Sequence, residues 1–367
     1  VKTVELAHEL RRQGAEVRAV MTDAAGGIVH PWSLEFATEN PVTTEITGSV
    51  EHVELCGYDG WADVLLLAPA TANTVGKVAS AIDDTPVTTA ATTALGADVP
   101  VVVAPAMHEP MYDHPGVLEA IERLESWGVG FVEPRLEEGK AKIATEEAIV
   151  LEVARSVGDR PLAGRHVVVT SGPTSESIDP VRVLTNRASG RTGRAVAKAC
   201  YARGADVTLV HDGEAVPYAD VLSVESATEM LDAVRSVAGE ADALVSAAAI
   251  GDYTVETAPE KIRSGRELTL ELDPTPKLID TIREEFPELS IVGFKLETDD
   301  DDESMIERAR ETLRRAGLAF VVANDASVMG SETTRVLLVG SEDVSAEEGS
   351  KDEIGGRIAE ALAERLR

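Results

Sequence analysis

Short apolar runs alternate with amphipathic segments along the whole chain, and this alternation limits the possible folds more than any other feature. The runs are continuous and rich in Val and Leu, which is typical of strands buried on both faces of a sheet. Such strands belong to parallel sheets with helices on both sides, so the sequence predicts a doubly wound α/β fold. We expect strands at residues 16–21, 63–68, 101–104, 166–170, 206–210, 243–248, 268–272, 290–294, 320–323 and 335–339, and helices at residues 115–127, 145–157, 191–203, 227–238 and 303–316.

The length of 367 residues predicts two domains, since single hydrophobic cores stop growing at about 250–300 residues. We expect domains at residues 1–158 and 165–367, joined by a linker at 159–164. Each part contains a helix that ends near Gly-Ala and leads into a strand. In the second part a strand and a small-residue loop precede this helix, whereas the first part begins at the helix. We therefore expect the first domain to lack its opening strand and the phosphate-binding loop that commonly follows it.

The chain carries 65 acidic and 34 basic residues, which gives a net charge of −31. This charge argues against a nucleic-acid partner, whose phosphates need a basic surface, and against docking on anionic lipid. Only nine basic residues are lysine, and aromatic residues make up 4% of the chain. Together these features are typical of a surface adapted to high salt, where ions screen the repulsion between like charges. A lysine retained on such a surface is a candidate for chemistry.

The two cysteines, Cys56 and Cys200, are too few for a disulfide framework and lack CxxC spacing. We expect Cys56 to be structural. No apolar run reaches the ~20 residues of a membrane span, and no signal peptide opens the chain. We therefore expect a cytoplasmic protein with no membrane partner. The acidic run at 298–303 is expected to be a solvated loop that leads into a helix.

Three loops in the first part follow predicted strands, where the ligands of open α/β sheets gather. The first contains Thr22. The second reads Ala-Pro-Ala-Thr-Ala-Asn-Thr at residues 68–74 and includes Thr71 and Asn73, and the third includes Met107. Small residues let a ligand approach the backbone, and hydroxyl and amide groups can bind a phosphate or a flat heterocycle. Taken singly, each loop also fits ordinary turn chemistry.

Together with Glu-His-Val-Glu-Leu at residues 51–55, these loops resemble the flavin-binding phosphopantothenoylcysteine decarboxylase family in order and approximate spacing. The resemblance covers nearly all of residues 1–157 and implies a flavodoxin-like domain in which His52 is the active-site base. Without it, His52 would be interpreted as a surface histidine. In the family, FMN oxidises the cysteinyl thiol of 4′-phosphopantothenoylcysteine, CO2 is lost, and reduced FMN returns the hydride. The FMN contacts that the resemblance implies are Thr22, Thr71, Asn73 and Met107.

The first part departs from this family at two positions. Bacterial members commonly carry Asn after Pro-Ala-Met to hold the substrate carboxylate, and here that position is His108. Histidine can still donate a hydrogen bond or a charge to a carboxylate. Bacterial members also have a flap cysteine that reprotonates the product, whereas the matching stretch at residues 134–143 has none. Lys140 and Lys142 are the candidates there for an acid or a carboxylate anchor.

The second part contains a small-residue segment, Ser-Gly-Arg-Thr-Gly at residues 189–193, that can cradle a phosphate at a helix start. Dehydrogenases use similar loops with an acidic residue after the next strand, and Asp212 keeps a dinucleotide conceivable. The run Ser-Ala-Ala-Ala-Ile-Gly-Asp-Tyr at 246–253, followed by Pro-Glu-Lys-Ile at 259–262, instead closely resembles phosphopantothenate–cysteine ligases. Asp-Pro-Val-Arg at residues 179–182 matches the same family, and the resemblance extends from about residue 165 to 340.

Ligases of this family activate a carboxylate with a nucleoside triphosphate, usually CTP in microbes, and the cysteine amine then attacks the acyl-cytidylate. The resemblance implies that Lys261 binds the triphosphate and that Asp252 holds Mg2+ or the ribose. It also implies that Asn186 stabilises the acyl-cytidylate. The further CTP contacts that it implies are Ala247, Ala248, Pro276, Lys277, Leu278, Ile279 and Phe294. Many members carry lysines at the positions of Thr312 and Ala316, so the identity of the nucleotide stays open.

The sequence therefore favours a bifunctional enzyme of coenzyme A biosynthesis, which joins cysteine to 4′-phosphopantothenate and decarboxylates the product. The catalytic candidates are His52, His108, Asn186 and Lys261. One alternative is a ligase with an inactive flavin domain. Another is a non-catalytic flavoprotein or dinucleotide-binding subunit. Family analogy implies a homo-oligomer.

Overall fold

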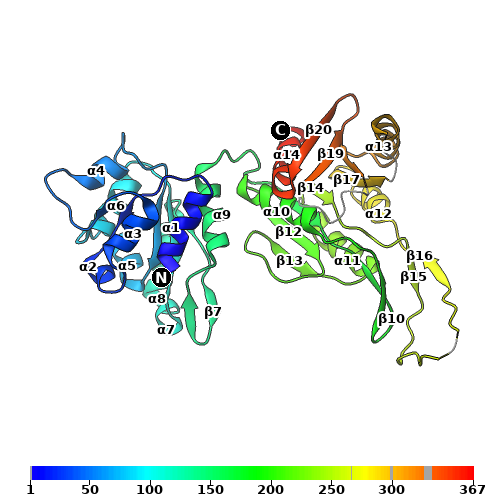
Figure 1. Ribbon diagram of the computed structural model, residues 1–367, viewed down its shortest axis with the longest axis horizontal. Coiled ribbons are helices and arrows are strands. Elements are labelled where there is room, and N and C mark those ends of the chain that lie inside the picture. Colours follow the sequence, from blue (N-terminus) through cyan, green and yellow to red (C-terminus); the bar gives the residue numbers. More distant parts are fainter. Residues whose placement is uncertain (1, 266, 298–300, 326–332) are drawn as a thin grey trace. The chain divides into compact units, whose positions relative to one another are not determined.

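The computed structural model describes residues 2–265, 267–297, 301–325 and 333–367 (Figure 1). The chain divides into two compact units, Val1–Gly158 and Asp159–Arg367. The segment 159–164, which we expected to be a linker, belongs to the second unit. Leu162 is fully buried, and its backbone N–H donates to the carbonyl of Arg203 at 3.1 Å. This segment is therefore a packed turn.

The first unit alternates helices with short strands. Its helices are α1 (Lys2–Arg12), α2 (Asp23–Gly26), α3 (Pro31–Thr38), α4 (Glu51–Cys56), α5 (Ala72–Ala79), α6 (Pro86–Gly96), α7 (Glu109–Tyr112), α8 (Pro115–Ser126) and α9 (Glu146–Val157). Its strands are β1 (Ala19–Val20), β2 (Val42–Thr43), β3 (Leu65–Ala70), β4 (Val101–Pro105), β5 (Met107–His108), β6 (Gly130–Phe131), β7 (Arg135–Glu137) and β8 (Lys140–Lys142).

The centre of the first unit is a parallel sheet of β3, β4 and β6. Strand β4 is buried along its whole length. Val101 and Val103 pack into one hydrophobic cluster, whereas Val102 and Ala104 pack into another on the opposite face. This alternation places helices on both sides of the strand, as the continuous apolar run predicts. Strands β1 and β2 form a separate parallel pair, and β5, β8 and β7 form an antiparallel sheet.

The second unit contains a larger sheet, four long helices and one shorter helix among its described residues. Its strands are β9 (His166–Thr170), β10 (Ser175–Asp179), β11 (Arg182–Thr185), β12 (Asp206–His211), β13 (Asp220–Ser223), β14 (Ala243–Ser246), β15 (Tyr253–Val255), β16 (Leu272–Pro274), β17 (Ser290–Glu297), β18 (Phe320–Asp325), β19 (Thr333–Val339) and β20 (Val344–Ser350). The long helices are α10 (Arg191–Ala202), α11 (Ala227–Ala238), α13 (Asp302–Ala316) and α14 (Lys351–Arg365), together with the eight-residue α12 (Leu278–Glu285).

The eight strands of the main sheet run in the order β13-β12-β9-β14-β17-β18-β19-β20. The first six are parallel, and β19 and then β20 are added at one edge, each antiparallel to the strand before it. The chain starts in the middle at β9, goes outward through β12 and β13, and then returns to β14 on the other side. This reversal is the topological switch point of a Rossmann-like sheet, where ligands bind beyond the carboxyl ends of the strands.

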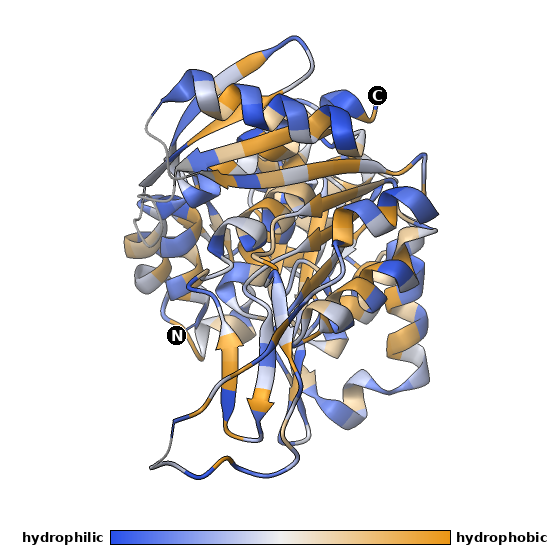
Figure 2. Cartoon of the chain, turned by 90° about the vertical axis from the view of Figure 1, so that its right-hand side faces the viewer, coloured by the Kyte–Doolittle hydropathy of each residue, from blue (hydrophilic) through white to orange (hydrophobic). Residues whose placement is uncertain are grey.

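Helices cover both faces of this sheet. One face packs against α11, α12 and α13, with Met230, Ile282 and Met305 in its core. The other face packs against α10 and α14. These two helices approach each other so closely that Gly355 has no room for a side chain, since a Cβ there would lie 2.6 Å from the Ala195 carbonyl carbon. Figure 2 shows the apolar colour running along the strands and the hydrophilic colour on the outer sides of the helices.

The predicted helices and most of the predicted strands agree with the structure to within a few residues, and the differences lie mainly outside the two main sheets. The strand expected at 268–272 is wrong, since only Leu272 lies in a strand and the side chains of Leu268 and Leu270 are exposed. The strand expected at 16–21 is shorter, at Ala19–Val20. The antiparallel pairs β10–β11 and β15–β16, which extend away from the sheet (Figure 1), were not predicted. The helix expected after the acidic run begins at Asp302 with Asp301 as its cap, and residues 298–300 lie outside the described residues.

Among the described residues, no helix combines the length and the apolar character that crossing a bilayer requires. Both cysteines are free and buried, and burial raises the pKa of the Cys56 thiol to about 11 and that of Cys200 to about 12. A thiol with so high a pKa is a poor nucleophile at neutral pH, which agrees with the structural role expected for Cys56.

Candidate active sites

In the first unit, the loops after β3 and β4 meet at the carboxyl end of the sheet. The backbone N–H of Ala106 donates to the carbonyl of Ala70 at 2.9 Å. The segment carrying Thr71 and Asn73 therefore begins beside the segment carrying Met107. Thr71 and Asn73 are exposed, and Met107 is half-buried. The structure thus brings together two of the three predicted flavin-binding loops.

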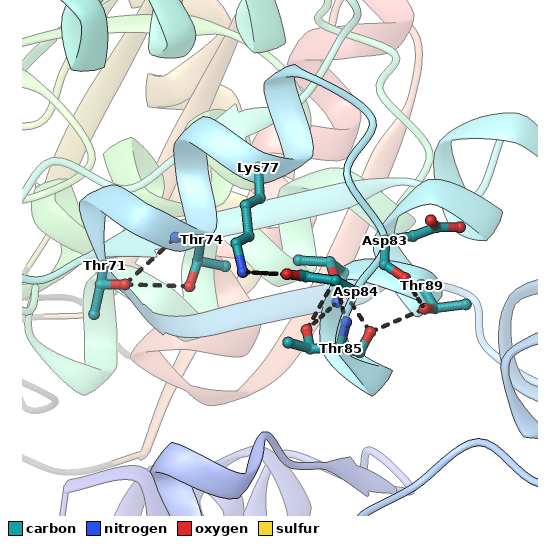
Figure 3. Close-up of polar contacts among 8 residues, drawn as sticks. Thr71, Thr74, Lys77, Asp83, Asp84, Thr85 and Thr89 are labelled. Atoms are coloured by element: carbon teal, nitrogen blue, oxygen red, sulfur yellow. Dashed lines mark hydrogen bonds and ion pairs between the residues drawn. The ribbon is translucent and has the colours of Figure 1, made fainter.

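Hydrogen bonds fix the start of α5 on this edge. Thr71 caps the helix, since its Oγ1 accepts from the backbone N–H of Thr74 at 3.4 Å and lies 3.2 Å from the Thr74 hydroxyl (Figure 3). One turn further on, Lys77 forms an ion pair of 2.8 Å with Asp84. These contacts leave the Asn73 side chain at an ordered helix start, where backbone N–H groups favour an anion.

The remaining predicted loop, which contains Thr22, lies beside the separate pair of β1 and β2. Thr22 caps α2 by accepting from the backbone N–H of Ala25 at 3.2 Å. The preceding residue, Met21, donates its N–H to the carbonyl of Thr43 at 2.8 Å, which ties the loop to β2. No hydrogen bond between described residues links Thr22 to Thr71 or Met107. Its place in a shared flavin site stays a prediction.

His52 lies in α4, which packs against α6. The side chain is half-buried, and its Nδ1 is buried with no hydrogen-bond partner in the described part of the chain. A buried ring nitrogen without a partner is costly unless a ligand or water satisfies it. The predicted role of His52 as a base stays a prediction.

His108 and Lys140 face each other across the antiparallel pair of β5 and β8. Both are exposed, and the Glu109 N–H donates to the Gly139 carbonyl at 3.1 Å at the same end. Lys142 points to different partners, since its ammonium lies 3.0 Å from both Glu137 and Glu138 and these hydrogen bonds raise its pKa. The structure therefore separates the two lysines of the predicted flap. Lys140 lies opposite His108, whereas Lys142 forms ion pairs with Glu137 and Glu138.

In the second unit, the loops after β9 and β14 interlock at the switch point. The backbone N–H of Ala248 donates to the Thr170 hydroxyl at 3.2 Å, and the N–H of Ala249 donates to the Gly172 carbonyl at 2.9 Å. The N–H of Gly251 donates to the Thr174 hydroxyl at 2.8 Å. Phe294 joins this edge because Ser246 pairs with Gly293 in the parallel register. Ala247, Ala248 and Phe294 therefore lie at one edge of the sheet, and their contact with CTP stays a prediction.

Asn186 is held against the same loop. Its Nδ2 donates to the Ala249 carbonyl at 2.5 Å, and its Oδ1 accepts from the N–H of Ala188 at 3.1 Å. Two glycines at the start of α10, Gly190 and Gly193, have no room for a side chain. A Cβ on Gly190 would lie 2.9 Å from the Gly172 backbone, and one on Gly193 would lie 2.7 Å from the Ser171 side chain. The start of α10 is therefore packed directly on the loop that follows β9.

Asp252 and Lys277 form an exposed ion pair of 2.5 Å. The N–H of Thr275 donates to the Asp252 carbonyl at 3.0 Å, which places Pro276 and Lys277 beside the β14 loop just before α12.

Leu278 is 3% exposed and packs in the core, so its side chain does not face a ligand and only its backbone is available for the predicted contact. Ile279 is partly buried against the same core. Ala316 is also buried, at 3% exposure.

Lys261 is exposed in the segment between β15 and β16, and no ion pair joins it to another described residue. The neighbouring residue is anchored, since the backbone N–H of Ile262 donates to the buried carboxylate of Asp179 at 3.1 Å. Among the described residues, no group of three or more His, Cys, Asp or Glu side chains could hold a metal ion. Asp252 is thus the single protein carboxylate predicted for Mg2+, and it contacts Lys277.

Three residues at this site were missed as site residues. Thr170 and Thr174 hold the β14 loop, and Asp179 holds the Lys261 segment. Asp179 belongs to the motif at 179–182, where its closeness to Arg182 in the sequence makes a contact between these two residues predictable. The contact of Asp179 with Ile262 has no such local signal. Its partner Ile262 is 83 residues away.

Comparison with known proteins assigns both units. The family described as the DNA/pantothenate metabolism flavoprotein C-terminal domain matches residues 162–366, and the flavoprotein family matches residues 1–158. The coenzyme A biosynthesis bifunctional protein CoaBC of Thermococcus kodakarensis is 51% identical over 346 residues, which cover 93% of this chain and 86% of that protein. The chain belongs to the CoaBC family.

A second CoaBC protein matches nearly the whole chain, and a solved CoaBC domain matches part of it. CoaBC of Methanocaldococcus jannaschii is 36% identical over 368 residues and covers 99% of this chain and 90% of its own length. A crystal structure of the C-terminal domain of a CoaBC protein is 29% identical, covers 57% of this chain and 98% of its own, and has a TM-score of 0.48. Membership of the CoaBC family confirms the resemblance of both halves that the motifs indicated.

Proposed function

We propose that the second unit joins cysteine to 4′-phosphopantothenate with CTP and Mg2+, and that the first unit decarboxylates the product with FMN. Both steps belong to coenzyme A biosynthesis, for which the CoaBC relatives are named. We expect the reactions to take place in the cytoplasm. The observation that carries the ligase assignment is the contact between Asn186 and Ala249, which joins two family motifs at the switch point of the sheet.

The charges of the second unit suit an anionic nucleotide. Lys261 and Lys277 supply cations, and backbone N–H groups at the start of α10 supply further donors. Lys261 is a mobile point charge that can neutralise charge developing on the phosphates. Asp252 can exchange its contact with Lys277 for Mg2+ on the bound nucleotide, which also frees the Lys277 ammonium. Asn186 is a neutral donor and does not compete with the cysteine amine as a nucleophile.

The donor set of the first unit fits a flavin. Thr71 and Asn73 offer a hydroxyl and an amide beside Met107, and His52 has a buried Nδ1 that lacks a partner among the described residues. FMN supplies two-electron redox chemistry when it is bound. The chain's own residues position the substrate and move protons. His52 is the proposed base, and His108 with Lys140 is the proposed site for the substrate carboxylate, since both are exposed and lie opposite each other.

The apolar surface of the first unit supports a homo-oligomer. Ile28, Trp32 and Phe36 are 85%, 74% and 75% exposed, respectively, and they lie close together along the chain between α2 and the end of α3. Several large apolar side chains that are exposed within one short segment commonly mark a protein–protein interface. Light scattering on the purified chain measures the mass of the assembly directly.

A two-part assay tests the proposed function. The chain is incubated with 4′-phosphopantothenate, cysteine and Mg2+, and pyrophosphate is measured with CTP, ATP, GTP and UTP in turn. We expect release with CTP that EDTA stops. Added FMN and 4′-phosphopantothenoylcysteine should then yield CO2. Pyrophosphate without CO2 would favour the ligase with an inactive flavin domain, and release of neither would overturn the proposal.

A further inference from the structure

A buried carboxylate in the second unit holds the backbone beside Lys261. Asp179 is 1% exposed, and it lies at the end of β10. Its Oδ1 accepts from the backbone N–H groups of Val181 and Arg182 at 2.8 and 2.9 Å. Its Oδ2 accepts from the N–H of Ile262 at 3.1 Å and from the Arg182 guanidinium at 2.6 Å. All of the contacts that a carboxylate needs on burial are therefore present.

These contacts also determine the protonation state of Asp179. Burial by itself would raise the pKa of Asp179, but the three backbone donors and Arg182 outweigh it and hold the pKa below its usual value. Asp179 is therefore ionised at neutral pH, and its charge is matched by Arg182. The carboxylate consequently does not compete with a nucleotide for the Lys261 ammonium.

Asp179 and Arg182 fix both polar groups of the residue after Lys261. Asp179 binds the N–H of Ile262, and the Arg182 guanidinium donates to the Ile262 carbonyl at 3.1 Å. Upstream, the N–H of Ala258 donates to the Ile178 carbonyl at 2.9 Å. The segment that carries Lys261 thus lies along the end of β10, although its own residues 256–263 form neither helix nor strand.

The same hairpin carries Asn186. Strand β11 begins at Arg182 and ends at Thr185, directly before Asn186. One short hairpin therefore anchors Lys261 at its turn and Asn186 at its end. We propose that Asp179 is a positioning residue for the ligase reaction, which sets Lys261 at a fixed distance from the acyl-nucleotide by binding the Ile262 amide. This inference rests on the proposed role of Lys261.

The decisive variant is Asp179→Asn, which keeps the shape but removes the charge and one acceptor. We expect kcat for CTP-dependent pyrophosphate release to fall about 10- to 100-fold, because small displacements of a catalytic group are costly. KM for 4′-phosphopantothenate should change less than threefold. Hydrogen exchange of a peptide covering residues 258–265 should accelerate, since the Ile262 N–H loses its acceptor.

Glu176→Gln is the matched control. Glu176 is a second buried carboxylate on β10, 6% exposed, and it binds the Ala227 N–H and the Thr254 hydroxyl at 2.8 Å each. It makes no contact with Ile262 among the described residues. We expect this variant to lose thermal stability while kcat stays within about twofold and exchange at 258–265 stays slow. If Asp179→Asn fails to fold, Arg182→Ala replaces it as the test, because it removes only the contact of a half-exposed side chain with the Ile262 carbonyl. We expect it to lower kcat less than the fall given above for Asp179→Asn.

Four results would overturn the inference. The first is fast exchange at 258–265 in Asp179→Asn with wild-type kcat. The second is an equal loss of kcat in Glu176→Gln, which would mean that any damage to the hairpin suffices. The third is full pyrophosphate release by Lys261→Gln, which would remove the proposed role of Lys261 itself. An inactive Lys261→Gln together with a fully active Asp179→Asn and Arg182→Ala would reject the positioning role alone.

Discussion

The side-chain amide of Asn186 donates a hydrogen bond to the backbone carbonyl of Ala249, with 2.5 Å between nitrogen and oxygen. The two residues are 63 positions apart, and the contact joins the end of the β10–β11 hairpin to the loop after β14. The orientation of the amide is fixed on its other side, where Oδ1 accepts from the N–H of Ala188.

Asn186→Asp should impair turnover of the acyl-cytidylate. The variant puts a carboxylate oxygen where a donor faced the Ala249 carbonyl, so two acceptors repel each other and the loop shifts. We expect kcat for ligation to fall by at least about tenfold, measured by quenched-flow analysis of the acyl-nucleotide. Asn40→Asp is the control, because Asn40 Nδ2 donates to the Val17 carbonyl at 2.9 Å in the first unit. Unchanged ligation in Asn186→Asp would remove Asn186 from the site.

Lys261→Gln should abolish ligation and leave decarboxylation intact. The variant keeps a polar side chain, one bond shorter, but removes the charge that we propose binds the triphosphate. Pyrophosphate and CO2 release are measured on the same preparation. Arg263→Gln removes an equal charge two residues away and should retain ligation within about threefold, as expected for an exposed surface charge. Equal loss of both activities in Lys261→Gln would contradict the model of two separate sites.

His52→Asn should block decarboxylation only. Asparagine cannot accept a proton at neutral pH, whereas the imidazole can. The measurement is CO2 release from 4′-phosphopantothenoylcysteine, with ligation as the internal reference. His30→Asn is a suitable control because His30 caps α3 through its Nδ1, a position where Asn also caps well. Full CO2 release by the His52 variant would reject His52 as the base.

Lys140 and Lys142 should differ in their importance for decarboxylation. Lys140→Ala removes the exposed cation opposite His108, and we expect it to raise KM for 4′-phosphopantothenoylcysteine about tenfold, as for the loss of a charge-assisted contact. Lys142→Ala breaks exposed contacts with Glu137 and Glu138, which contribute little, so KM should stay within about twofold. The reverse order would show that Lys142 is the anchor.

Stability should increase with salt. At a net charge of −31 the acidic residues repel one another, and raising KCl from 0.1 to 1 M shortens the screening length from about 10 to about 3 Å. We expect Tm, followed by circular dichroism, to rise over this range and further towards 3 M. KCl is preferred to sulfate because sulfate also strengthens hydrophobic burial. A Tm that is flat or falls with KCl would contradict adaptation to high salt.

The amino-acid sequence by itself determined the class of fold and the motifs. Strand β4 was predictable because four consecutive apolar residues must be buried on both faces, and that pattern is local. Helix α11 was predictable to the residue because Ser226 and Glu229 form a capping box within one turn. The family resemblance was visible for the same reason, since each motif is a short continuous stretch.

The tertiary structure alone decided which distant residues meet. The contact of Asp179 with Ile262 spans 83 residues, and nothing in the local pattern of either segment specifies it. The register that pairs His108 with Lys140 joins β5 to β8, two strands that are distant in the chain, and a shift of one residue would bring Gly139 or Ala141 opposite His108 instead. Local periodicity follows from backbone geometry, whereas register and long-range hydrogen bonds follow from how the whole unit packs. The sequence therefore named the catalytic candidates, and the fold determined what holds them.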